Sequence, residues 1–222
     1  MSQTENKPKV KIAVLIGGGS RLPAIYSSLQ KPASSAELVL VLSYKKQSTG
    51  LEWAIEQGLN ARYWRWSEWR AAGHSRSEYD AALAELLLAQ GVELVVLAGW
   101  GLLLTHAFLD RFPNRIINVH PALLSETFES YVKLEDGSQI EVFRGNNAIE
   151  LALQAGVSVT GCTVHYVTEE MDAGPILLRQ EVPVLPGDTV ESLGERIHAA
   201  EDQLLPQGIE LAAQRLLAGG RV

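Results

Sequence analysis

Apolar runs that each stop at a glycine or polar turn constrain the fold of this chain more than any other feature. Residues 10–16, 38–43 and 92–98 are nearly continuous stretches of β-branched and other apolar residues, the pattern of strands buried on both faces of a parallel sheet. Helical spacing follows the first run at Leu22, Ile25, Tyr26 and Leu29. We therefore expect an α/β protein with a single-domain, Rossmann-like architecture: an open, twisted, mostly parallel sheet flanked by helices.

Weaker patterns supply the remaining elements. Ser75 with Glu78 three residues later has capping-box spacing and predicts a helix start. Further helices are predicted over 51–57, around 107–112, over 146–155 and from Thr189 onward, where Pro206 should kink or split the helix. Strands are predicted over 61–66, 159–167 and 175–184, and a hairpin within 126–142 that turns at 134–137. Trp53, Trp64, Trp66 and Trp69 are interpreted as packing residues.

Three features follow predicted strands, where ligands of open α/β sheets bind, and should line one cleft. The first is the glycine turn 17–20, which either offers backbone N–H groups to a phosphate or is a tight turn without a ligand; Ser20 could cap the helix. The second is 99–104. The third is Asn118 with His120, which point to the same side of an extended strand. An amide beside an imidazole suits oxyanion stabilisation with proton transfer. The alternative is a strand end without a catalytic role, with Asn118 in a turn and His120 bonded to the backbone.

Composition excludes several classes of function. The net charge of −7 argues against general binding to nucleic acids or membrane surfaces, and no apolar run approaches the ~20 residues of a membrane span. The single cysteine, Cys162, allows no internal disulfide and favours a reducing compartment. Residues 1–9 are polar, so we expect a disordered tail rather than a secretory signal, and a cytoplasmic protein. The five histidines lack paired metal-ligand spacing, so no metal is expected.

From residue 11 to 219 the chain resembles the phosphoribosylglycinamide formyltransferases of the folate-dependent formyltransferase superfamily. The resemblance rests on ordered segments whose spacing also fits: 14–16 with Gly19 and Ser20, 95–99, 118–124, 159–165 and 171–176. It implies the formyltransferase fold over 10–222 and an extra segment at about 125–142, where the family has a short turn.

The implied reaction transfers the formyl group of the co-substrate 10-formyltetrahydrofolate to the amine of 5'-phosphoribosylglycinamide in de novo purine biosynthesis. Asn118, His120 and Asp172 match the family's catalytic residues. Asn118 would donate to the oxyanion, and His120 would stabilise it and protonate the departing folate nitrogen. Asp172 would favour the charged imidazole and help to hold a water.

The resemblance also implies substrate contacts. Phosphate and ribose would be bound by Gly18, Gly19, Ser20, Arg21 and Glu201. Folate would be bound by Arg76, Gly101, Leu102, Leu103, Leu104, Asn118, Thr168, Glu169, Glu170, Met171 and Asp172. Two positions depart from the family: Arg21 stands where asparagine is usual, and 101–104 lacks the family's arginine. Cys162 and His165 are interpreted as structural.

Two alternatives keep part of this interpretation. One is a formyltransferase for a different amine, or a formyltetrahydrofolate hydrolase. The other is a folate- or nucleotide-binding relative without catalysis, which the altered loops favour and the three matched catalytic residues oppose. Either way the partners are small molecules, and the chain is expected to be a monomer or homodimer.

Overall fold

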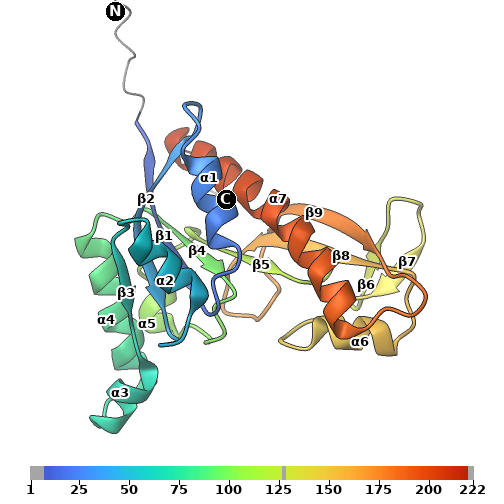
Figure 1. Ribbon diagram of the computed structural model, residues 1–222, viewed down its shortest axis with the longest axis horizontal. Helices are drawn as coiled ribbons and strands as arrows, with labels where there is room; N and C mark the ends of the chain where they lie inside the picture. Colours follow the sequence, from blue (N-terminus) through green and yellow to red (C-terminus); the bar gives the residue numbers. More distant parts are fainter. Residues whose placement is uncertain (1–7, 127–128, 220–222) are drawn as a thin grey trace, which may run out of the picture.

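The structure, a computed structural model, describes residues 8–126 and 129–219 and contains a seven-stranded sheet flanked by helices (Figure 1). In sheet order the strands are β3 (Ala61–Tyr63), β2 (Ala36–Ser43), β1 (Val10–Ile16), β4 (Leu94–Ala98), β5 (Ile116–His120), β8 (Val159–Tyr166) and β9 (Ile176–Pro183). The first five strands are parallel, whereas β8 and β9 are antiparallel to their neighbours. The predicted α/β class and mostly parallel sheet are confirmed. Of the predicted tail, residues 1–7 lie outside the described residues.

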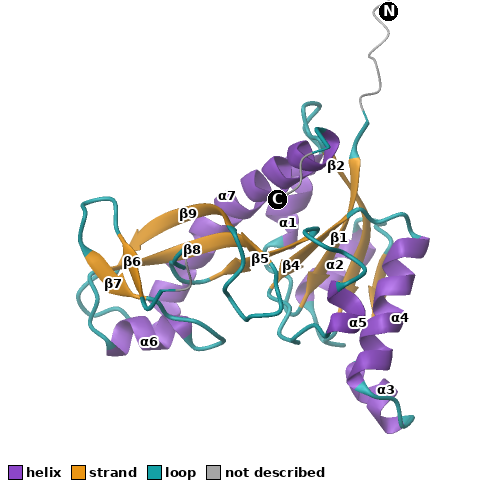
Figure 2. Ribbon diagram, turned by 180° about the vertical axis from the view of Figure 1, so that it is seen from behind, coloured by secondary structure: helices purple, strands orange, loops and turns teal. Residues whose placement is uncertain are grey.

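Helices cover both faces of the sheet. They are α1 (Leu22–Leu29), α2 (Thr49–Glu56), α3 (Trp66–Ala71), α4 (Arg76–Ala89), α5 (His106–Leu109), α6 (Ala148–Gln154) and α7 (Val190–Leu217). One core cluster joins α1, α2 and α7 to one face, and a second joins α4 and α5 to the other. The two views agree: α1 and α7 lie in front of the strands in Figure 1, and α4 and α5 in front in Figure 2. None of the helices in the described part of the chain combines the length and apolar composition needed to cross a membrane.

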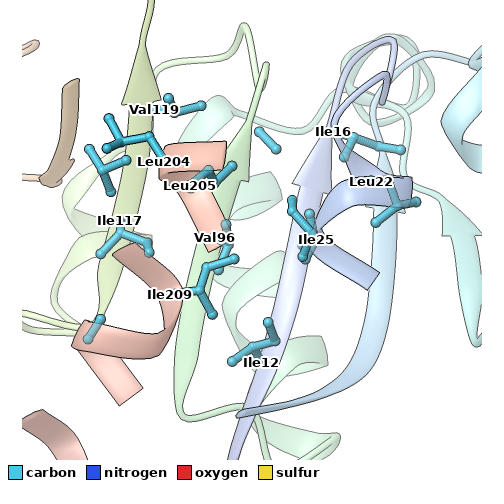
Figure 3. Packing of buried hydrophobic residues seen from close by; sticks show 14 of the residues in the cluster. Ile12, Ile16, Leu22, Ile25, Val96, Ile117, Val119, Leu204, Leu205 and Ile209 are labelled. Carbon is cyan, nitrogen blue, oxygen red and sulfur yellow. The ribbon is translucent and has the colours of Figure 1, made fainter. Parts of the chain in front are cut away.

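The long helix α7 continues past Pro206 without a break, so of the two effects predicted for this proline, a kink or a split, the split is wrong. Leu204 and Leu205 before the proline, and Ile209 after it, are buried. Figure 3 shows these side chains lying against those of β4 and β5. Burial of a leucine or isoleucine contributes roughly 1.5–3 kcal/mol, so three anchors outweigh the ~3 kcal/mol that an interior proline costs.

Strand β4 is the central strand, and all five of its residues are buried. The strand order reverses direction between β1 and β4, because β2 and β3 lie on one side of β1 and β5 lies beyond β4. A crevice is expected outside the carboxyl ends of the strands at such a switch point. The turn after β1 and the loop after β4 therefore flank the natural binding position of this sheet.

The predicted strand 61–66 ends early, at Tyr63, and Trp66 begins the short helix α3. Trp66 and Trp69 are three residues apart, so on a helix both rings reach Tyr79, at centroid distances of 5.4 and 5.9 Å. This aromatic contact favours a helix over a longer strand. The interpretation of the tryptophans as packing residues is confirmed, since Trp53 also packs, against Tyr26 at 5.7 Å.

The extra segment forms the predicted hairpin, with β6 (Tyr131–Lys133) paired to β7 (Gln139–Glu141). It has a small core of its own, in which Val132, Leu134 and Val142 pack with Leu123 and Leu124. In Figure 1 it lies at the same end of the molecule as α6. Residues 127 and 128 of the segment lie outside the described residues.

Candidate active site

A cleft of about 800 Å³ opens at the carboxyl ends of the parallel strands. Residues that follow β1, β4 and β5 all reach it, as does the loop between β8 and β9. Its lining residues are Arg21, Tyr44, Leu97, Gly99, Trp100, Gly101, Leu102, Leu103, Leu104, Asn118, Val119, His120, Pro121, Gly145, Asn146, His165, Val167, Thr168, Glu169, Glu170, Met171, Asp172 and Glu201. Segments far apart in the sequence thus meet in one cavity.

Asn118 is oriented by a histidine on the neighbouring strand. Antiparallel pairing of β5 with β8 places Asn118 opposite His165, and Asn118 Nδ2 lies 3.3 Å from His165 Nε2. The other ring nitrogen, His165 Nδ1, lies 2.9 Å from the carbonyl oxygen of Tyr166, to which it donates, so Nε2 accepts from the amide. Burial lowers the pKa of His165, which keeps this neutral tautomer. One Asn118 N–H is thereby held by His165, and the second is left for a ligand.

His120 has one ring nitrogen committed to the backbone. Its Nε2 lies 2.7 Å from the carbonyl oxygen of Phe143, an acceptor only, so Nε2 carries a hydrogen. Its Nδ1 lies 3.4 Å from Asp172 Oδ2. The histidine is almost fully buried, yet it lines the cleft. Nδ1 is therefore the ring nitrogen that is not held by the backbone and that faces Asp172.

Asp172 lies between the two histidines. Its Oδ1 is 3.8 Å from His165 Nε2, and its Oδ2 accepts a hydrogen bond of 2.8 Å from the backbone N–H of Gly145. Its φ of +53° places it in the left-handed region, which aspartate tolerates better than most residues. Arg144 Nε donates to the Asp172 carbonyl oxygen at 3.3 Å. The residues that return from the hairpin thus fix both His120 and Asp172.

Arg21 and Glu201 form an ion pair that lines the cleft, and they are two of the residues at which the sequence predicts phosphate and ribose contacts. Glu201 comes from α7, and its side chain is 1% exposed, whereas that of Arg21 is 12% exposed. Burial raises the pKa of the Glu201 carboxyl to about 7, although the Arg21 guanidinium beside it acts in the opposite direction. The carboxylate therefore depends on a cationic partner or hydrogen-bond donors to stay charged.

The glycine turn lies beside this pair, but Gly18, Gly19 and Ser20 do not line the cleft. A Cβ at Gly19 would lie 2.7 Å from Gly50 Cα, so close packing of two loops accounts for that glycine. Ser20 is not the cap of α1: Arg21 occupies that position and caps with no side-chain hydrogen bond. Among the described residues, no acceptor binds the backbone N–H groups of Gly19, Ser20 and Arg21, which leaves these donors available to an anion.

One wall of the cleft is the loop 101–104, and Arg76 supports it from behind. Arg76 does not line the cleft. It donates to the Leu103 carbonyl oxygen at 2.6 Å and pairs with the fully buried Asp80 at 3.0 Å. Asp80 in turn accepts from the Thr105 backbone N–H at 2.7 Å. The two side chains of α4 thus hold the carboxyl-terminal end of the wall, and Arg76 contacts the loop rather than the cavity.

The opposite wall is the turn 168–172, whose residues all line the cleft, as the sequence predicts. Glu169 Oε1 lies 2.9 Å from His106 Nε2 on α5. This contact joins the turn 168–172 to the helix that follows the loop 101–104. This hydrogen bond with Glu169 raises the pKa of His106. Leu103 and Met171, 70% and 50% exposed, give the two walls apolar surface next to the polar floor.

Among the lining residues with polar side chains, three are not predicted as site residues from the sequence: Tyr44, Asn146 and His165. Tyr44 directly follows β2, so the rule that selected the other strand ends would have found it. His165 was interpreted as structural; no pattern reveals that it pairs with Asn118, because strand register is not readable from one sequence. In residues 8–126 and 129–219, no group of three or more His, Cys, Asp or Glu side chains is placed to hold a metal ion.

Comparison with known proteins gives a consistent result. The family model described as "Formyl transferase" matches residues 10–209. A phosphoribosylglycinamide formyltransferase of Dictyostelium discoideum is 32% identical over 92% of this chain and 98% of its own length. A glycinamide ribonucleotide transformylase of Symbiobacterium toebii has a TM-score of 0.81 and 40% identity, over 93% of this chain and 88% of that one.

A second group of relatives is much longer than this chain. The trifunctional purine biosynthetic protein adenosine-3 of Gallus gallus is 42% identical over 92% of this chain, which covers 18% of that protein. The human protein of the same name is 38% identical, and 19% of it is covered. The chain thus spans about a fifth of the length of these relatives.

Proposed function

The chain belongs to the formyl transferase family, and from this premise we propose that it transfers the formyl group of 10-formyltetrahydrofolate to the amine of phosphoribosylglycinamide in de novo purine biosynthesis. One observation carries the proposal: Asn118, His120 and Asp172 converge at the floor of a single cleft, with His120 Nδ1 3.4 Å from Asp172. The names of the relatives indicate the acceptor and the transferred formyl group, the family resemblance indicates the folate donor, and the geometry supports the chemistry.

The reaction begins when the amine lone pair attacks the formyl carbon and the carbonyl π electrons move to oxygen. Asn118 donates its free amide N–H to this oxyanion, while its other N–H stays on His165. Protonated His120 adds positive charge from Nδ1, because its Nε2–H is held by Phe143. An oxyanion donor contributes about 10²–10³-fold to the rate.

The intermediate then collapses and releases folate. A lone pair on the oxyanion re-forms the carbonyl bond, and the bond from carbon to the folate nitrogen breaks. That nitrogen takes a proton from His120 Nδ1, and the attacking amine passes its own proton through a water back to His120, so the imidazolium is regenerated and the proton count balances. Asp172 holds the imidazolium between these transfers and accepts a hydrogen bond from a bridging water. A positioned proton donor contributes about 10²–10⁴-fold.

The proposal divides the cleft between two substrates. The acceptor's phosphate and ribose lie near Arg21 and Glu201, at the end of α1 that offers unused N–H groups. Folate lies between the walls 101–104 and 168–172, where apolar side chains meet backbone groups. Asn118 and His120 lie between these regions and reach the carbon that both substrates share.

The test is a turnover assay with a 10-formylfolate and phosphoribosylglycinamide, in which release of deformylated folate is followed. We expect release that depends on the amine. Release that proceeds equally without any amine would identify a hydrolase, and release that depends on a different amine would identify another acceptor. Absence of release under all conditions would overturn the assignment.

The proposal treats 10–222 as one formyltransferase domain that works as a monomer or homodimer on small molecules, without nucleic acid or membrane partners. Location in the cytoplasm fits the buried free thiol of Cys162.

A further inference from the structure

Arg21 and Glu201 belong to two different parts of the proposed acceptor site, yet they bind each other. Arg21 lies between β1 and α1, next to the turn that offers backbone donors. Glu201 lies on α7, 180 residues later in the chain. Both side chains line the cleft. An incoming acceptor therefore meets a site whose charged groups already neutralise each other.

The surroundings make this pair hard to open without compensation. Three other titratable groups interact with one or other partner: Cys162 from β8, and His198 and Asp202 from α7. None of these three groups is a permanent cation, as Arg21 is. Burial lowers the pKa of His198 and so favours its neutral form. Removal of Arg21 leaves Glu201 as a buried carboxylate without a counter-charge, an arrangement that proteins avoid.

A ligand with two kinds of group can satisfy both partners. The planar guanidinium of arginine binds phosphate bidentately, and a carboxylate accepts hydrogen bonds from hydroxyl groups. We propose that Arg21 exchanges partners: the acceptor's phosphate draws it away from Glu201, and the freed carboxylate binds the ribose hydroxyls. This inference rests on the proposed function and adds a specificity-determining role for Arg21.

The exchange makes the phosphate and ribose interactions depend on each other. Ribose without phosphate has to displace Arg21 from Glu201, and it carries no anionic group that could pair with Arg21 instead. Phosphate without ribose leaves Glu201 buried and unpartnered. Only a ligand that carries both groups replaces every interaction that it breaks, so binding should be far tighter than the two fragments predict.

The experiment is isothermal titration of the whole protein at pH 7 with three probes: ribose 5-phosphate, ribose and inorganic phosphate. Wild type is compared with Arg21→Gln, with Glu201→Gln and with Arg65→Gln, a control in which an arginine loses its exposed pair with Glu68. We expect Arg21→Gln to lower the affinity for ribose 5-phosphate about 10–100-fold, the effect of a lost charge-assisted contact. Ribose alone should bind to this variant more tightly than to wild type.

Glu201→Gln provides the reciprocal observation and does not depend on the folding of the first variant. With its partner removed, Arg21 is free, so inorganic phosphate should bind roughly 3–10-fold more tightly than to wild type. Arg65→Gln should match wild type with every probe. If the pair is purely structural, both variants should have a lower affinity for all three probes, and that result would overturn the exchange.

The outcome is separable from that of the turnover assay. If ribose binds no more tightly to Arg21→Gln, and phosphate no more tightly to Glu201→Gln, while amine-dependent formyl transfer is intact, the exchange is rejected and the proposed function is retained. Fragment gains without any formyl transfer would establish the exchange and reject the proposed reaction.

Discussion

The proton chemistry of the cleft depends on which atoms of His120 and Asp172 the backbone already occupies. Phe143 holds His120 Nε2, and Gly145 holds Asp172 Oδ2, so both side chains are fixed before any substrate binds. Preorganised groups of this kind need no rearrangement during the reaction. The site is therefore sensitive to changes in charge as well as in shape.

His120→Ala and Asp172→Asn should each lose most of the activity while the fold is kept. Removal of the proton donor should lower kcat about 10²–10⁴-fold. Asparagine tolerates the left-handed backbone of position 172, so Asp172→Asn removes only the charge. The measurements are kcat for turnover and circular dichroism for folding, with exposed His74 changed to alanine as control. Full activity of Asp172→Asn would refute its role.

Glu201 makes stability depend on pH. Its pKa rises from 4.5 to about 7 on folding, chiefly through burial. The folded protein therefore keeps a proton that the unfolded chain loses between these values, so stability falls as pH rises through this window. Between pH 5 and 8, wild type should lose roughly 2 kcal/mol of unfolding free energy relative to Glu201→Gln. Urea unfolding of both proteins at the two pH values measures this, and a constant difference would contradict it.

Single residues differ in how far the sequence predicts them. The two-residue spacing of Asn118 and His120 is enough to place both on one side of β5. The pairing of Asn118 with His165, in contrast, depends on the register between β5 and β8, which forms only when the sheet assembles. Arg21 illustrates a third case: its position next to the glycine turn is readable, but its partner 180 residues away is not.

Among the elements, the inserted hairpin bears directly on the chemistry through its anchors. Arg144 Nη2 donates to Ser125 Oγ at 3.3 Å and to the Glu129 carbonyl oxygen at 3.1 Å, while its Nε reaches the Asp172 carbonyl oxygen. Arg179 also holds the start of the segment, through the Leu124 carbonyl oxygen at 3.0 Å, but makes no contact with Asp172. Variants of the two arginines can therefore serve as controls for each other.

Arg144→Gln should therefore lower kcat about 10-fold with little change in KM, since loss of one positioning contact corresponds to roughly 1–1.5 kcal/mol. Arg179→Gln should leave kcat near that of wild type, although it removes a comparable anchor. Steady-state kinetics of the two variants decide the matter. Equal losses would mean that the hairpin matters only for stability, and no loss in either would mean that Asp172 is positioned without it.

Element types followed from local patterns, and the errors arose where tertiary contacts dominate. The capping box of Ser75 and Glu78 is formed as predicted, because it involves only neighbouring residues. Helix α3 was missed because Tyr79, with which its tryptophans pack, lies on the next helix. Pro206 does not split α7, because the sheet holds the helix on both sides of the proline.

At the scale of the whole molecule, α7 joins the parallel part of the sheet to its antiparallel extension. It contacts β1, β2, β4 and β5 as well as β8 and β9. It also carries Glu201 into the cleft. The sequence predicts that the helix exists and is amphipathic, but it does not give the strand order beneath it. The distance between α7 and the sheet therefore determines both stability and the position of an acceptor-site residue.

At Gly208, α7 approaches the sheet closely. A Cβ built there would lie 2.6 Å from Val164 Cγ1 on β8, and a valine cannot move aside because its side chain is stiff. Gly194, on the same helix, is also buried, but its Cβ would meet Ile149 Cδ1 at an ordinary 3.7 Å. Two glycines in one helix therefore predict opposite results for the same substitution.

Gly208→Ala should lower the unfolding free energy by about 1–3 kcal/mol through overpacking, despite the gain in helix propensity. Gly194→Ala should raise it by up to about 1 kcal/mol, because propensity acts there unopposed. Urea denaturation measures both. Val164→Ala removes the opposing methyl groups, so the double variant with Gly208→Ala should be more stable than the sum of the single effects by about 1 kcal/mol. Strict additivity would show that the helix moves away from the sheet as a whole, in which case the affinity for ribose 5-phosphate should fall as Glu201 moves with it.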